Sequence, residues 1–105
     1  MKAIAHARDP FGYDVKVENF CELDGVQKDI SYFKNNIVKV IEQPGMMIEV
    51  FDTSLKRYYF GAVTWNQTIL VGVRNKNGTW SVTKCFENPS ASLVTPIFLR
   101  GNQLI

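Results

Sequence analysis

The chain has few of the residues that bind metals. Among its 105 residues there is one histidine, His6, and there are two cysteines, Cys21 and Cys85, with no Cys-x-x-Cys pair. A structural zinc site normally needs four cysteine or histidine ligands at close spacing. The sequence therefore predicts no metal and no other cofactor. We expect both cysteines to be buried thiols, with a disulfide between them as the alternative.

Long apolar runs and an excess of charge are also missing. No segment reaches the ~18 apolar residues that a membrane span requires, and no charged and apolar leader opens the chain. We therefore expect a cytoplasmic protein with no membrane partner. The formal net charge of +2, from 12 Lys and Arg against 10 Asp and Glu, does not by itself identify a nucleic-acid binder. With 46% hydrophobic residues, the composition predicts a single domain over residues 1–105.

One helix is predicted over Asp24 to Gln43. Asp24 offers an N-cap side chain, and the apolar residues that follow recur at helical spacing. Gln43-Pro44-Gly45 should end the helix, because proline lacks the amide that an inner turn needs. The apolar stripe consists of Val26, Ile30, Phe33, Ile37, Val40 and Ile41.

Strand patterns occupy most of the remaining chain. A turn is expected at Asp9-Pro10-Phe11-Gly12, followed by a short strand over Tyr13 to Glu18. Beyond the helix, breaks at 52–54, 65–67 and 75–78 separate strands at Met46 to Phe51, Lys56 to Thr64, Thr68 to Arg74 and Thr79 to Phe86. The predicted fold class is α+β, with one main amphipathic helix packed on a four- to five-stranded antiparallel meander. The segment from Pro89 to Ile105 stays unassigned.

The strand register predicts which side chains leave the core. We expect four-residue loops at Thr64 to Gln67 and at Asn75 to Gly78. The helix would then cover Tyr58, Phe60, Ala62, Ile69, Val71, Val73, Trp80, Val82 and Phe86. The open face would carry Arg57, Tyr59, Gly61, Gly72, Arg74, Thr79, Ser81, Thr83 and Cys85. This face is either an ordinary solvated surface or a site that binds anions.

His6 is the remaining candidate for chemistry. It lies two residues before Arg8, so on an extended chain both side chains point to the same face. A neutral histidine can take a proton from a nucleophile, and an adjacent guanidinium can stabilise negative charge on a phosphate. A structural role for this histidine is the alternative.

Three short sequence motifs together resemble those of a known family. They are His6-Ala7-Arg8, the helix end Val40-Ile41-Glu42-Gln43-Pro44-Gly45, and Val82-Thr83-Lys84. Their order is similar to that of the barnase, EndoU, colicin and RelE superfamily of small ribonucleases, in its phage and polymorphic-toxin branches. The segment from Lys2 to Arg8 departs from that family, because it is too short for the usual amino-terminal catalytic helix.

The resemblance implies a metal-independent endoribonuclease that cleaves RNA through attack of the 2′-hydroxyl. The implied catalytic residues are His6, Arg8, Arg57 and Thr83, and the expected substrate-binding residues are Lys56, Tyr59, Arg74 and Ser81. RNA would be the substrate, and a cognate antitoxin or immunity protein would be a partner. The alternative function is a non-catalytic module that binds protein or RNA through the open sheet face.

Overall fold

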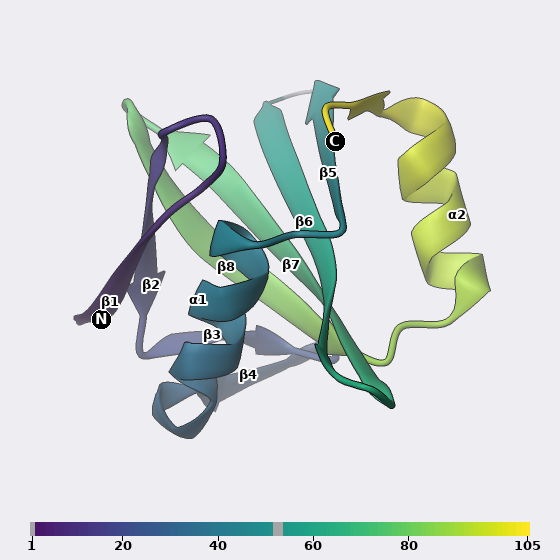
Figure 1. Cartoon of the computed structure of the whole chain (residues 1–105). Coiled ribbons are helices and arrows are strands. Elements are labelled where there is room, and N and C mark those ends of the chain that lie inside the picture. Colours follow the sequence, from purple (N-terminus) through teal and green to yellow (C-terminus); the bar gives the residue numbers. More distant parts are fainter. Residues whose placement is uncertain (1, 52–53) are drawn as a thin grey trace.

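A computed structural model describes residues 2–51 and 54–105. Its elements follow one another with short connections, as Figure 1 shows. Two α-helices and a 3₁₀ turn are present in these ranges, namely α1 (Lys34–Glu42), α2 (Ala91–Arg100) and η1 (Ser31–Phe33). The strands are β1 (Ala3–Arg8), β2 (Asp14–Glu18), β3 (Phe20–Leu23), β4 (Val26–Asp29), β5 (Met46–Phe51), β6 (Leu55–Thr64), β7 (Gln67–Lys76), β8 (Thr79–Glu87) and β9 (Asn102–Gln103).

The predicted fold class is wrong. In place of one main helix on a four- to five-stranded antiparallel meander, the described residues form a mixed nine-stranded sheet with two short helices. The strands run in the order β1-β2-β8-β7-β6-β5-β9, and β3 joins β8 with β4 outside it. Within this sheet β5 to β8 do form the expected antiparallel meander. The sheet is larger than expected and mixed because β8 also pairs in parallel with both β2 and β3.

The predicted helix begins ten residues too early. Asp24 and Gly25 both have positive φ angles, 51° and 84°, and form the turn between β3 and β4. Asp-Gly is a preferred sequence for a two-residue hairpin turn, so it competes with the N-cap role that we expected for Asp24. The helix end is confirmed, since α1 stops at Glu42, just before Gln43-Pro44.

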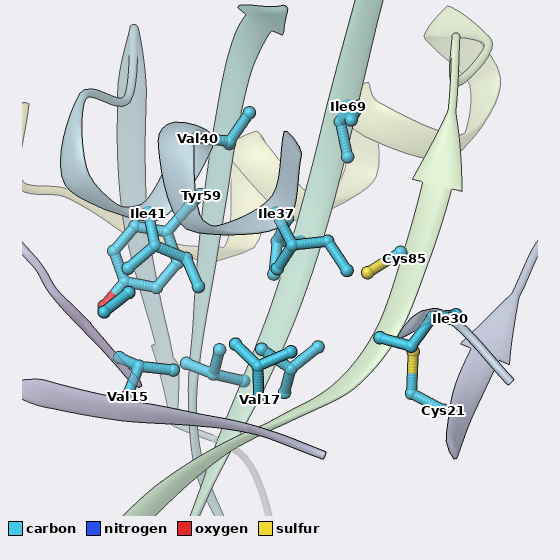
Figure 2. Close-up of a cluster of buried hydrophobic side chains, with 14 of the residues drawn as sticks. Val15, Val17, Cys21, Ile30, Ile37, Val40, Ile41, Tyr59, Ile69 and Cys85 are labelled. Carbon is cyan, nitrogen blue, oxygen red and sulfur yellow. The ribbon is translucent and has the colours of Figure 1, made fainter. Parts of the chain in front are cut away.

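The two faces of the sheet are covered by different helices. The face toward α1, here called the inner face, carries the larger core, and the opposite face, here called the outer face, is covered by α2 over β5 to β7. Most of the predicted stripe is buried in the inner core, namely Ile30, Phe33, Ile37, Val40 and Ile41, whereas Val26 is exposed. Figure 2 shows side chains of α1 packed on those of β2, β6 and β7.

The predicted register of β6 is wrong by one residue. Thr64 pairs with Gln67 across a two-residue turn, but the next pair is Ala62 with Thr68, so Val63 is an extra residue in the strand. Because side chains alternate between faces, one inserted residue moves the rest of β6 to the opposite face. Tyr58 and Phe60 therefore pack on the outer face beneath α2. Arg57, Tyr59 and Gly61 therefore lie on the inner face of the sheet. We expected Tyr58 and Phe60 on that face.

The β7–β8 hairpin keeps the predicted faces although its loop is shorter. Asn77 and Gly78, with φ angles of 54° and 86°, form a two-residue turn in place of the expected four-residue loop. The change of two residues preserves which side chains point outward, so Arg74, Thr79 and Ser81 do lie on the outer face. A bulge in β8, opposite Gly72 and Val73, then shifts the register by one residue. Cys85 therefore lies on the inner face and Phe86 on the outer face, the reverse of the prediction.

The terminal segments complete the sheet. The predicted turn at Asp9 to Gly12 is confirmed, because Gly12 N donates to Asp9 O at 2.9 Å. Residues 2–8 were left without a predicted structure, and within them Ala3–Arg8 form the edge strand β1. The segment that we left unassigned contains α2 and β9, and β9 pairs with β5. The predicted break at 52–54 includes Asp52 and Thr53, which lie outside the described residues. Among the described helices, none is both long and apolar enough to cross a membrane.

Candidate anion-binding cleft

A cleft of about 420 Å³ opens on the outer face where β2 and β3 meet the β7–β8 hairpin. Its position follows from the split pairing of β8. β2 pairs with Trp80 and Ser81, and β3 pairs with Lys84 and Cys85, so neither pairs with the stretch between. The lining residues are Lys16, Glu18, Phe20, Cys21, Gln27, Arg74, Lys76, Asn77, Thr79, Ser81, Val82 and Thr83.

Cross-strand pairing gathers cations beside this cleft. Lys16 is the partner of Ser81 on β8, and Ser81 is in turn the partner of Arg74 on β7. Directly paired side chains point to the same face of a sheet, so these three lie in one row. The row continues to His6 on one side of Lys16 and to Lys56 on the other side of Arg74. We refer to these five residues, of which Lys16, Arg74 and Lys56 are cations, as the cationic row.

The cleft lining includes several polar side chains, some of which suit an anion. Glu18 lies 3.9 Å from the Lys16 ammonium group, a long separation for an ion pair. Thr79, Ser81 and Thr83 add hydroxyl groups, and the Thr83 hydroxyl donates to Gly72 O at 3.3 Å. Ammonium, guanidinium and hydroxyl groups are the side-chain donors that bind phosphate oxygens.

Two neighbouring hollows extend the positive surface across the outer face. A small one contains Lys56, Arg74 and Lys84, and a larger one beside α2 contains Lys84 and Arg100. Six of the twelve Lys and Arg residues in the chain thus line these three depressions. Within the described chain, Glu18 is their one acidic lining residue. The lining is therefore more positive than the whole chain, although Glu22, the cross-strand partner of Lys84, lies beside it.

The structure brings together part of the predicted site. Arg74, Ser81 and Thr83 line the cleft, and Lys56 lies in the cationic row next to Arg74. His6 is exposed on β1, one strand beyond Lys16 and outside the cleft lining. Arg8 is also on the outer face, with its side chain 68% exposed, and it is paired with Asp14 through Nη2 and Oδ1 at 3.2 Å.

Arg57 and Tyr59 lie apart from these residues, on the other face of the sheet. We expected both to be exposed, but Arg57 is 3% and Tyr59 0% exposed. The Arg57 guanidinium lies over the rings of Tyr13 and Trp80, 4.2 and 4.1 Å from their centroids. Its Nη2 atom donates to Glu49 Oε2 at 2.6 Å. The prediction of an exposed Arg57 is therefore wrong, and the extra residue in β6 is the reason.

Asp9 completes this buried cluster. Its Oδ1 accepts hydrogen bonds from the backbone amides of Phe11 and Tyr13, and its Oδ2 accepts one from the Tyr59 hydroxyl at 2.6 Å. Arg57 Nη1 is 3.7 Å from the same Oδ2 atom. Arg57 and Asp9 are both buried, whereas the Glu49 side chain is partly exposed.

The titration behaviour of the cluster agrees with a structural role. Burial, aided by the hydrogen bond to Asp9, raises the pKa of Tyr59 above its usual range. Burial alone would lower the pKa of Arg57, but the interactions with Glu49 and Tyr59 together outweigh that effect and the pKa is raised. Arg57 therefore stays charged and Tyr59 stays protonated inside the fold.

Both cysteines are buried free thiols, as expected. Cys21 lines the cleft and Cys85 lies beneath it in the inner core. A hydrogen bond from Cys85 lowers the pKa of Cys21. The same bond, together with burial, raises the pKa of Cys85.

The sequence reasoning missed several residues of the outer face. They are Lys16, Phe20, Lys76, Lys84 and Arg100. Lys16 carried a usable signal, because it is the outward residue in the alternating segment Tyr13 to Glu18. Lys76 was missed because the β7–β8 loop is shorter than expected. The other three depend on the bulge in β8 or on the positions of β3 and α2, for which the sequence offered no long-range signal.

No group of three or more His, Cys, Asp or Glu residues in the described chain is arranged to hold a metal ion. Searches of family models, curated proteins and solved structures found no match to this chain. The resemblance to small ribonucleases therefore stays a prediction.

Proposed function

We propose that the outer face of the sheet binds single-stranded RNA through its phosphates. The cationic row carries this proposal, since cross-strand pairing aligns Lys16, Ser81 and Arg74 beside a cleft. Adjacent strands are ~4.8 Å apart, so Lys16 and Arg74, on either side of β8, have Cα atoms ~10 Å apart. This arrangement suits an extended polyanion that crosses the strands.

Features beside the row favour RNA. Phe20 lines the cleft and is 40% exposed, so it offers a ring on which a base can stack. The hydroxyls of Thr79, Ser81 and Thr83 can exchange hydrogen bonds with a ribose 2′-hydroxyl, the group that distinguishes RNA from DNA. We place this activity in the cytoplasm, where RNA is present and where Cys21 and Cys85 would stay reduced.

Fluorescence anisotropy with a labelled single-stranded RNA over a range of salt concentrations tests the proposal. Lys16→Gln and Arg74→Gln should each weaken binding and reduce the magnitude of the salt slope by ~0.7, the value for one phosphate contact on a single strand. Lys28→Gln is the matched control, because Lys28 is exposed on β4 and does not line the cleft. Equal losses in all three variants, or no RNA binding by the wild type, would contradict the proposal.

RNA cleavage is the second candidate function, and the position of His6 favours it. His6 is exposed and is the direct partner of Lys16, so an imidazole stands at the end of the cationic row. Its reaction would be attack of a ribose 2′-hydroxyl on the adjacent phosphorus, which releases a 5′-hydroxyl. A cognate antitoxin or immunity protein would then cover the same face.

This candidate is tested by incubating RNA with the protein in EDTA. A catalytic His6 predicts that His6→Ala lowers the cleavage rate at least ~10²-fold while RNA binding changes little. Intact RNA with the wild-type protein, in the presence of measurable binding, would leave the non-catalytic module as the function.

A further inference from the structure

A groove lies between α2 and β8, beside the cationic row. The groove has a volume of about 310 Å³, within the usual range for a small ligand. Its apolar walls come from Phe86 on β8 and from Leu93 and Ile97 on α2. Two cations, Lys84 and Arg100, also line it. An apolar slot with cations suits a flat ring that carries a negatively charged group.

The groove is continuous with the proposed RNA surface. It shares Tyr58 and Lys84 with the small hollow of Lys56 and Arg74, and that hollow shares Arg74 and Thr83 with the main cleft. A strand bound along the cationic row thus has a direct path into the groove.

The helix offers a polar contact in the groove as well. Pro96 lies inside α2 and has no amide hydrogen, so it cannot donate the bond that the Ser92 carbonyl would normally accept from the residue four positions later. Both Ser92 and Pro96 line the groove. The Ser92 carbonyl can therefore accept a hydrogen bond from an N–H group on the edge of a base.

Arg100 is held where a phosphate could reach it. Its Nε atom donates to Pro96 O at 3.3 Å, which keeps the guanidinium near the groove. A guanidinium presents several N–H donors, so donors other than Nε can bind a phosphate oxygen.

We propose that this groove takes one nucleotide of a bound RNA strand, with the base between Phe86 and α2 and the phosphate at Lys84 and Arg100. The inference rests on the proposed RNA-binding function for the rest of the strand. The nucleotide pocket is nevertheless a separate site that a mononucleotide can test alone.

The test is NMR titration of the ¹⁵N-labelled full chain with 5′-AMP, with inorganic phosphate as a parallel probe. AMP should cause saturable shifts at the amides of Leu93 and Arg100, and phosphate should not reproduce them. Arg100→Ala and Lys84→Gln should each weaken AMP binding by about tenfold, the loss of a charge-assisted hydrogen bond. Lys28→Gln should leave it unchanged.

The outcomes separate the two proposals. No AMP shifts in the groove, or identical shifts with phosphate alone, would overturn the nucleotide pocket even if RNA still binds through Lys16 and Arg74. Saturable AMP binding that both variants weaken would support the pocket even if longer RNA fails to bind. If Arg100→Ala unfolds, seen as collapsed amide dispersion, Lys84→Gln alone decides.

Discussion

The guanidinium of Arg57 is held inside the fold by two aromatic rings and two carboxylates, although its Nη1 atom has no hydrogen-bond partner among the described residues. It lies against the rings of Tyr13 and Trp80, which also contact each other edge to face, and Glu49 and Asp9 neutralise its charge. Burying an unpaired cation would cost several kcal/mol, so sequence reasoning favours an outward Arg57. The alternation pattern of β6 could not reveal that Asp9, almost fifty residues earlier, supplies a carboxylate.

Replacing Arg57 should therefore be far more damaging than replacing an exposed arginine. Arg57→Met leaves Asp9 buried without its cation and should lower the free energy of unfolding by about 3–5 kcal/mol. Arg8→Met, which breaks an exposed ion pair, should cost at most about 1 kcal/mol. Urea denaturation of both variants measures the difference, and similar losses would refute the structural role of Arg57.

The raised pKa of the Tyr59 hydroxyl predicts that the folded chain loses stability at high pH. Its folded pKa is raised above the usual value of 10.0, so the unfolded chain releases the tyrosine proton first as the pH rises. The contribution of this group is complete below pH 10 and declines above it, by up to ~1.4 kcal/mol per pH unit. Denaturation between pH 9 and pH 11.5 should show this decline.

Tyr59→Phe is the control, because it removes the ionisable hydroxyl and keeps the buried ring. The variant should be less stable at neutral pH, since Asp9 loses a hydrogen bond, but its stability should decline less steeply above pH 10. Parallel declines in the two proteins would assign the effect to another group.

At the scale of elements, turns and bulges decided which predictions succeeded. The Asp9 to Gly12 turn and the Gln43-Pro44 helix end were predictable because proline and glycine act locally. The Asp24-Gly25 turn carried an equally local signal, which we read as a helix cap. The bulge at Val63 was not predictable, because it depends on which residues of β6 fit against α1 and Asp9.

The docking of α2 and β9 on the sheet depends on Gly101. A side chain there would overlap Ile48 Cγ2 and come within 3.1 Å of Val50 Cγ2, both on β5. Gly101→Ala should thus push the end of α2 away from β5 and destabilise the chain by about 1–3 kcal/mol. Gly12→Ala is unsuitable as a control, since Gly12 has a φ angle of 87°.

Hydrogen exchange can locate the effect of Gly101→Ala. Amides of α2 should lose protection, whereas those of α1, on the opposite face, should change little. Uniform loss of protection across both helices would show that α2 does not loosen independently.

For the whole molecule, the sequence could indicate the meander and much of the inner core but not the complete sheet. Local alternation predicted β5 to β8, and helical spacing predicted the buried residues of α1. The parallel pairing of β8 with β2 and β3 joins segments about sixty residues apart, and no local pattern encodes it. The outer-face candidates Arg74, Ser81 and Thr83 were found although the predicted β7–β8 pairing was wrong by two residues. A shift of two residues leaves each side chain on the same face of the sheet.

The same long-range pairing makes the candidate site a reporter of complete folding. The cleft is absent until β8 has joined β2 and β3, a step that closes a long loop and is expected to be late and slow. A partly folded chain that contains only the meander would hold Arg74 and Ser81 but not Lys16 beside them. An anion bound in the cleft would therefore bind the native state alone and stabilise the entire chain by mass action.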